Sequence, residues 1–206
     1  MASAEPVPAA TDAPVDTRTR LLEASLACVE RSGLRDTSLD DVARQAGMSR
    51  ATVYRYFPGG REQLVSDTVT FEVGNFLRRL GEAVAGEPDL AGRLRTGLVF
   101  GHRAVVDHGL LQQVLHTERD VFLRELADAG PLMLATVRAY LREQLDGERL
   151  EPGVSADEAA EHLARLFLSY LGSHGRWDMT DPAAVNRLVR TYLLAGIVVD
   201  PGARRP

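Results

Sequence analysis

The stretch SLDDVARQAGMSRATVYRYF, residues 38–57, constrains the fold more than any other part of this chain. It contains two short runs with helical spacing, and Gly47 stands between them at a position typical of a helix end. Ser38 followed by Asp41 makes an approximate capping box, and Ser49 can cap the second run. The residues PGG come next and stop that run. The pattern predicts two short helices joined by a tight turn.

A further helix is expected before this pair. From Thr17 to Ser32 the apolar residues Leu22, Leu26 and Val29 recur at helical spacing, and Gly33 follows them. A supporting helix followed by two short helices around a glycine turn matches the helix-turn-helix arrangement, in which the second helix of the pair enters the major groove of DNA. We therefore expect a three-helix DNA-binding domain over residues 17–62.

The inward residues of the last of these helices define its outward ones. If Val53 and Phe57 pack inward, the other side chains of residues 50–56 lie wholly or partly outside. Between Val42 and Arg61 the sequence has four arginines and no Asp or Glu, whereas the formal net charge of the chain is −5. The local charge is therefore positive on an acidic protein, as expected where a surface meets DNA.

Individual roles follow from these positions. Arg50 begins the recognition helix, where side chains reach base edges, and its guanidinium can bond a guanine bidentately. Thr37 and Ser38 lie at a helix N-terminus that can hold a phosphate, although ordinary capping explains both. Ala51 and Thr52 suit base contacts, whereas the aromatic and basic side chains after Val53 suit phosphate anchoring. The predicted DNA-binding residues are Thr37, Ser38, Ser49, Arg50, Ala51, Thr52, Tyr54, Arg55 and Tyr56.

The remainder predicts an all-α fold, because no β pattern competes with the helical spacing. We expect helices over residues 61–84, 89–108, 110–128 (continuous or with one break), 131–147, 155–173 and 181–198. Ser155 with Glu158 makes a full capping box, and Asp181 with Pro182 gives an N-cap with proline at the first helical position. Residues 1–16 and 201–206 read as flexible tails, and residues 63–200 as one helical domain. No signal peptide or membrane span is evident, so we expect a cytoplasmic protein.

The segment TSLDDVARQAGMSRATVYRYFPGGREQLV, residues 37–65, resembles the DNA-binding region of TetR-type transcriptional regulators. The glycine turn, the Ser-capped recognition helix and the VYRYF end carry the resemblance. Relative to the family pattern, the loop before Arg61-Glu62 is one residue longer, and Arg61 replaces a lysine. The resemblance implies that Arg61 contacts a phosphate, and it implies a homodimer whose second domain senses a small ligand.

The resemblance also implies that the last two long helices, 155–173 and 181–198, form the dimer interface. Each has an apolar stripe that permits this, although an intrachain core would produce the same stripes. The predicted interface residues are Leu163, Phe167, Tyr170, Leu171, Val185, Leu188, Val189 and Tyr192.

A ligand pocket is less clearly marked. Gly97 and Gly101 lie one helical turn apart, which leaves a groove on that helix, and aromatic and apolar residues follow on nearby helices. A largely apolar pocket with a few polar groups suits a hydrophobic effector, whereas close helix packing at the glycines is the alternative. The predicted pocket residues are Phe71, Gly97, Phe100, Gly101, His102, Leu111, Leu115, Met133, Val137 and Tyr140.

No metal site, catalytic constellation or cofactor is expected. His102, His108 and His116 lack the i, i+4 spacing of a helical ligand pair, and no phosphate loop or nucleophile elbow is present. We therefore expect a dimeric regulator that binds a near-palindromic double-stranded DNA operator, most simply a repressor released by a small hydrophobic effector. The alternative is a helical small-molecule-binding protein or enzyme with a vestigial helix-turn-helix.

Overall fold

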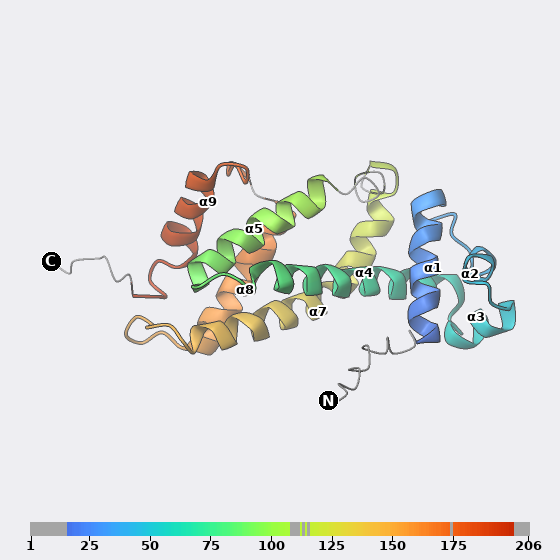
Figure 1. The fold of residues 1–206 in the computed structure, drawn as a ribbon, viewed down its shortest axis with the longest axis horizontal. Helices are drawn as coiled ribbons and strands as arrows, with labels where there is room; N and C mark the ends of the chain where they lie inside the picture. The colour runs from blue at the N-terminus through green and yellow to red at the C-terminus, as the bar shows by residue number, and fades with distance from the viewer. Residues whose placement is uncertain (1–15, 108–111, 113, 115, 174, 200–206) are drawn as a thin grey trace, which may run out of the picture. The chain divides into compact units, whose positions relative to one another are not determined.

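Helices form all the regular structure in the described part of the chain, apart from one isolated bridge between Leu150 and Val198 (Figure 1). The structure is a computed structural model, and it describes residues 16–107, 112, 114, 116–173 and 175–199. Residues 1–15 of the predicted N-terminal tail and all of the predicted C-terminal tail lie outside the described residues. The all-α prediction is therefore confirmed for the described chain.

The chain divides into two compact units, and the boundary between Thr68 and Val69 falls inside a helix. The first unit contains α1 (Thr17–Ser32), α2 (Leu39–Ala46), α3 (Arg50–Tyr56) and the start of α4 (Gly60–Val84). The second contains the rest of α4 with α5 (Leu90–Val106), α7 (Arg119–Leu145), α8 (Ala156–Gly172), α9 (Pro182–Leu188) and the π-helix η1 (Val189–Leu193).

The first unit folds around the apolar faces of its helices. Its fully buried side chains include Leu21, Val42, Val53 and Phe57. The hydroxyls of Ser25 and Thr68 are also buried and are hydrogen-bonded to each other at 2.8 Å, which satisfies two polar groups inside this core. Burying these apolar side chains stabilises α2 and α3, which are each too short to be stable alone.

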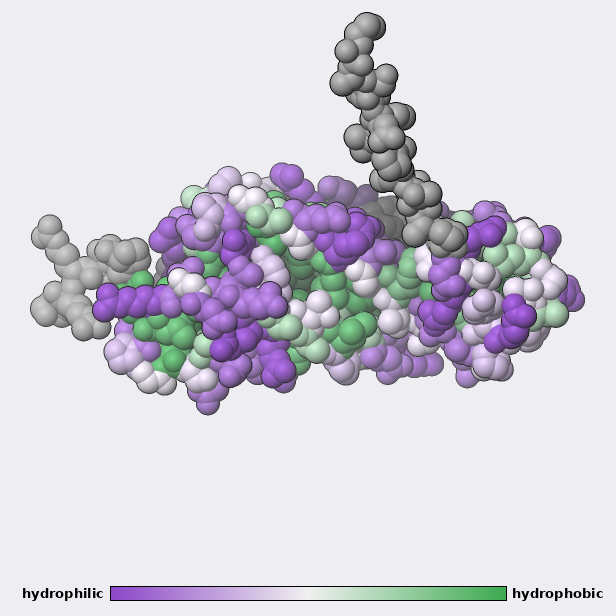
Figure 2. Space-filling model, turned by 60° about the horizontal axis from the view of Figure 1, so that its bottom comes forward, coloured by the Kyte–Doolittle hydropathy of each residue, from purple (hydrophilic) through white to green (hydrophobic). Residues whose placement is uncertain are grey.

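The second unit has its own core. It includes Leu98 from α5, Leu141 from α7, Leu163 from α8 and Leu188 from α9. Hydrophilic side chains cover most of the face drawn in Figure 2, with apolar residues showing between them, which is ordinary for a folded surface. None of the helices in the described ranges is long and apolar enough to cross a membrane.

Three helix predictions for the second unit were wrong in detail. α7 runs without a break through Pro131, where the sequence suggested that one segment ends and another begins. Proline removes one backbone donor, but Pro131 and the residue four positions earlier are both exposed, so water can satisfy the freed carbonyl. Ser155 starts α8, but its side chain makes no capping hydrogen bond.

The third error concerns the end of the last helix. α9 begins at Pro182 as predicted, and the carboxylate of Asp181 accepts a hydrogen bond from Ala183 N at 2.9 Å. The helix widens into η1 and stops at Leu193 instead of continuing to residue 198. Gly196, at φ +77°, reverses the chain, and Val198 then pairs with Leu150. A glycine at positive φ is a usual way to end helical structure.

Candidate nucleic-acid interface and ligand cavity

The turn between α2 and α3 has the geometry that its sequence predicted. Ser38 Oγ accepts from Asp41 N at 3.2 Å, so the first turn of α2 is capped. Gly47 takes φ +65° and ends α2, a conformation that favours glycine. Ser49 Oγ then accepts from Thr52 N at 3.1 Å and starts α3. These caps fix where α3 begins and therefore which of its side chains face outward.

α3 presents one face inward and the other to solvent. Val53 and Phe57 are 0% exposed, so they anchor the helix on the core of its unit. Arg50, Ala51, Tyr54 and Arg55 are exposed, whereas Thr52 and Tyr56 are half-buried. The outward face is therefore the one that the sequence predicted.

Arg50 has a partner that the sequence reading missed. Its Nη2 lies 2.5 Å from Oδ2 of Asp40, which belongs to α2, and the two side chains are 72% and 38% exposed. The other carboxylate oxygen of Asp40 is buried without a hydrogen-bond partner in the described structure. Asp40 therefore holds the guanidinium beside the start of α3. The signal available in the sequence was a carboxylate ten positions before the arginine that is predicted to read a base.

The remaining outward side chains are arranged around Arg55. Its guanidinium lies over the ring of Tyr56 at 5.4 Å, a cation–π contact that keeps a positive charge at the end of α3. The hydroxyls of Ser49 and Thr52 lie 2.9 Å apart and are hydrogen-bonded to each other. Ser49 is thus mainly a cap, and the exposed groups that remain free to meet a DNA backbone are those of Tyr54 and Arg55.

Asp41 contributes to the same end of α2. The hydroxyl of Ser38 donates to its carboxylate at 2.5 Å, and this hydrogen bond together with the nearby charge of Arg44 holds the pKa of Asp41 below its ordinary value. Asp41 also forms an ion pair with Arg44, so that arginine has a partner.

Two residues that were predicted to contact DNA make hydrogen bonds within their own unit. Thr37 is 1% exposed, and its hydroxyl donates to Gly33 O at 2.7 Å, so it closes the loop between α1 and α2. Arg61 donates from Nε to Thr37 O at 3.1 Å and from Nη2 to Leu34 O and to Arg35 O at 2.6 Å. It binds the backbone carbonyls of that loop to the first turn of α4.

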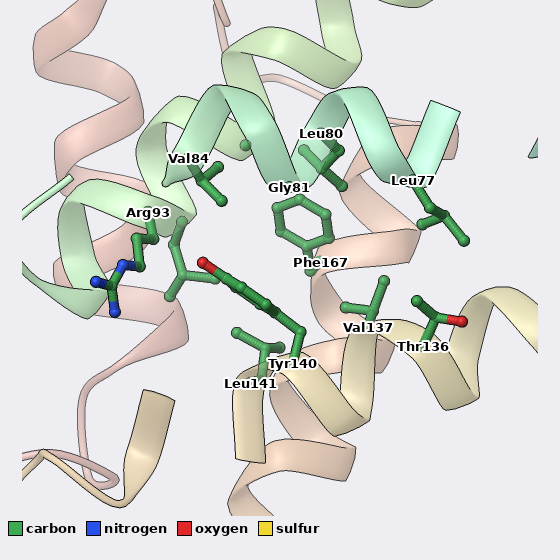
Figure 3. Close-up of a pocket in the computed structure, with 12 residues that line it drawn as sticks. Leu77, Leu80, Gly81, Val84, Arg93, Thr136, Val137, Tyr140, Leu141 and Phe167 are labelled. Atoms are coloured by element: carbon green, nitrogen blue, oxygen red, sulfur yellow. The ribbon is translucent and has the colours of Figure 1, made fainter. Parts of the chain in front are cut away.

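The second unit holds a cavity of about 110 Å³. α4, α5, α7 and α8 line it, and Figure 3 shows the ring of Phe167 from α8 between the other helices. Its lining residues are Leu77, Leu80, Gly81, Val84, Arg93, Leu94, Gly97, Thr136, Val137, Tyr140, Leu141 and Phe167. A largely apolar cavity with a few polar groups can hold a small molecule.

The comparisons with known proteins agree with this architecture. Residues 21–68 match the family model of bacterial regulatory proteins of the tetR family. An HTH-type transcriptional regulator of Mycobacterium tuberculosis is 35% identical over 107 residues, which cover 50% of this chain and 52% of that protein. The chain thus spans about half the length of that relative. A second such regulator of M. tuberculosis is 26% identical over 172 residues, 82% of each chain.

Residues 21–68 therefore belong to the TetR family. The fold of the chain also resembles the solved structure of the TetR family repressor AlkX from Dietzia sp., with a TM-score of 0.61 and 23% identity over 88% of this chain and 97% of that chain. The family consists of transcriptional regulators and not of enzymes.

Three of the ten predicted pocket residues line the cavity of the second unit: Gly97, Val137 and Tyr140. Phe71, Phe100, Gly101, His102 and Met133 do not, and Leu111 and Leu115 lie outside the described residues, as does His108. A side chain at Gly101 would collide with Leu171, so close helix packing, the alternative reading, explains that glycine. At Gly97 a Cβ would lie 3.0 Å from the ring of Phe167, so this glycine both packs closely and lines the cavity.

The predicted dimer stripes are mostly part of the core of the second unit. Leu163, Phe167, Val185, Leu188 and Val189 are all buried within the chain, so they have no surface to offer a partner. Tyr170 and Leu171 are half-buried, and Tyr192 is 50% exposed. In the described residues no group of three His, Cys, Asp or Glu side chains is placed to hold a metal ion.

Proposed function

We propose that this protein is a dimeric, sequence-specific DNA-binding repressor that a small apolar effector releases from its operator. The outward face of α3 carries the proposal. Val53 and Phe57 pack into the core of the first unit, so Arg50, Tyr54 and Arg55 face solvent. A recognition helix presents such a face to the major groove.

The outward side chains divide the work of recognition. Arg50 reads a base edge at the start of α3, and its ion pair with Asp40 fixes the direction of the guanidinium before DNA arrives. Tyr54 and Arg55 contact phosphates, which position the helix without specifying sequence. Ala51 lets the helix approach closely beside them.

Genomic selection tests this assignment. The purified chain should retain particular fragments of the source genome, whereas the double variant Arg50→Ala/Arg55→Ala should retain none of them above background. The matched control is Arg78→Ala/Arg165→Ala, which removes the same charge from two exposed, ion-paired positions of the second unit. Equal recovery by both double variants would refute the role of α3.

Dimerisation would explain recognition of a near-palindromic site. Two recognition helices about 34 to 36 Å apart fit successive major grooves. Of the residues predicted for the interface, Tyr192 keeps the largest exposed surface, and we place it at the contact between subunits. Tyr192→Arg should shift the protein from dimer toward monomer in light scattering, whereas Leu132→Arg, at a similarly exposed leucine on α7, should not. A Tyr192→Arg protein that remains fully dimeric would remove Tyr192 from the interface.

The cavity of the second unit is the proposed effector site. Its lining is mainly Leu, Val and Phe, which suits an apolar molecule, and AlkX of similar fold is implicated in biodegradation of n-alkanes. α4 contributes residues to the DNA-binding unit and to this cavity. If the effector binds more tightly to the protein when α4 is in one conformation than in another, it changes the affinity of the protein for DNA. By linkage, DNA then changes the affinity for the effector by the same factor.

A further inference from the structure

The cavity of the second unit is not uniformly apolar. Apart from Arg93, Thr136 and Tyr140, its lining consists of Leu, Val, Phe and Gly. In Figure 3 the side chain of Arg93 and the hydroxyl of Tyr140 lie at one end, whereas Leu77 and Thr136 lie at the other. One end of the cavity therefore carries a positive charge and a hydroxyl. Apolar side chains line the cavity between this end and the opposite one.

The charge of Arg93 is not matched by a carboxylate. Its Nη1 donates to the neutral amide oxygen of Gln144, and none of the ion pairs in the described chain includes it. Its Nε is buried and has no hydrogen-bond partner among the described residues. A buried donor on a charged group is costly when left unpaired, so this nitrogen is a ready contact for an anion.

Tyr140 supplies a second donor at the same end. Burial raises the pKa of its hydroxyl, which therefore stays protonated at neutral pH. The charge of Arg93 acts on the same hydroxyl in the opposite direction, which shows that the two groups are electrostatic neighbours. The acidic group that acts on this hydroxyl is Glu143, which is exposed and therefore screened by water.

We propose that the effector of this cavity is a small carboxylic acid, bound as its anion, with a short apolar tail. The carboxylate accepts hydrogen bonds from Arg93 and Tyr140, and the tail lies among the Leu, Val and Phe side chains. The inference rests on the proposed function, which makes this cavity the effector site. A cavity of about 110 Å³ is somewhat smaller than the roughly 150 Å³ that holds benzene, so it accepts an apolar tail of about six carbons at most.

Calorimetry with the full chain tests the charge preference. The probes are hexanoate, hexan-1-ol and hexylamine, which share one tail and differ in charge. Hexanoate should bind roughly tenfold more tightly than hexan-1-ol, and hexylamine most weakly, because a charge-assisted hydrogen bond is stronger than a neutral one. Arg93→Met and Tyr140→Phe should each remove most of the hexanoate preference and leave hexan-1-ol binding within about threefold of the wild type.

A glycine pair on α4 tests the location. Gly81 lines the cavity, and a Cβ added there meets open space, so Gly81→Leu should fill the cavity without a backbone clash and abolish binding of every probe. Gly74→Leu is the matched control, because Gly74 is exposed on the same helix and also has open space. It should bind hexanoate like the wild type. Hexanoate binding that survives Gly81→Leu would overturn the proposed site.

The outcomes separate this inference from the function on which it depends. If hexan-1-ol or hexylamine binds as tightly as hexanoate and Gly81→Leu abolishes that binding, the cavity is a ligand site but not one for carboxylates, and only this inference fails. If no probe binds while the protein still binds DNA, the effector site fails as well.

Discussion

Replacing Arg61 by methionine should loosen the DNA-binding unit without removing a phosphate contact. Arg61 donates to the carbonyls of Leu34, Arg35 and Thr37, and methionine keeps the aliphatic stem but none of the donors. The side chain is half-buried, so each hydrogen bond contributes about 0.5–1.5 kcal/mol. Loss of all three should lower the free energy of unfolding of this unit by roughly 1.5–4.5 kcal/mol.

Hydrogen exchange resolved by mass spectrometry measures this loss where it occurs. Peptides from residues 17–57 should exchange faster in Arg61→Met, whereas peptides from residues 156–193 should be unchanged. Arg78→Met is the control, since Arg78 is on the same helix, is exposed and forms an ion pair with Glu82. Exposed pairs of this kind contribute about 0–1 kcal/mol, so its exchange should match the wild type.

The salt dependence of DNA binding distinguishes the two roles of Arg61. A phosphate contact contributes about 0.9 to the slope of log K against log salt. We expect the slope of Arg61→Met to equal that of the wild type at a temperature where both are folded. Unchanged exchange with a slope reduced by about 0.9 would refute the structural role and restore the phosphate contact that the sequence predicted.

Three further changes test the interface. Arg50→Ala should weaken operator binding by roughly 1–3 kcal/mol and relax preference at one base position, as measured by fluorescence anisotropy on a set of single-base operator variants. Asp40→Asn removes a negative charge beside α3, so it should raise affinity for random DNA and lower the ratio of operator to random affinity; an unchanged ratio would show that Asp40 does not direct Arg50. Ser38→Ala should raise the pKa of Asp41 toward its ordinary value in an NMR titration. Because the pKa of Asp41 is lowered in the folded state, the stability that its carboxylate contributes is present above the unfolded pKa and is lost as pH falls through the folded pKa. If Asp41 of the wild type titrated at its ordinary pKa, this contribution would not exist.

The local features of the DNA-binding unit were predictable because short-range chemistry decides them. Ser38, Gly47 and Ser49 act within four residues of their own positions, so capping rules locate α2 and α3 without knowledge of the rest of the chain. The burial of Val53 and Phe57 follows from the same helical period.

Features that depend on distant partners were not predictable in the same way. The roles of Arg61 and Asp40 depend on atoms 24 and 10 positions away, respectively, and sequence spacing does not report such contacts. An apolar stripe is the same whether it meets its own chain or a partner, which is why residues such as Leu163 and Leu188 were assigned to an interface although they lie in the core. The predicted helix boundary at Pro131 was wrong for a related reason. Tertiary packing of α7 outweighs the helix-breaking tendency of one proline.

The measurement that tests the central claim most directly is the affinity of the purified protein for its selected genomic fragments as a function of salt, together with the stoichiometry of the complex. A DNA-binding repressor of the proposed kind should retain one near-palindromic site beside a promoter, bind it as whole dimers and show a steep negative salt slope. Weak binding that is the same for all sequences would contradict the account.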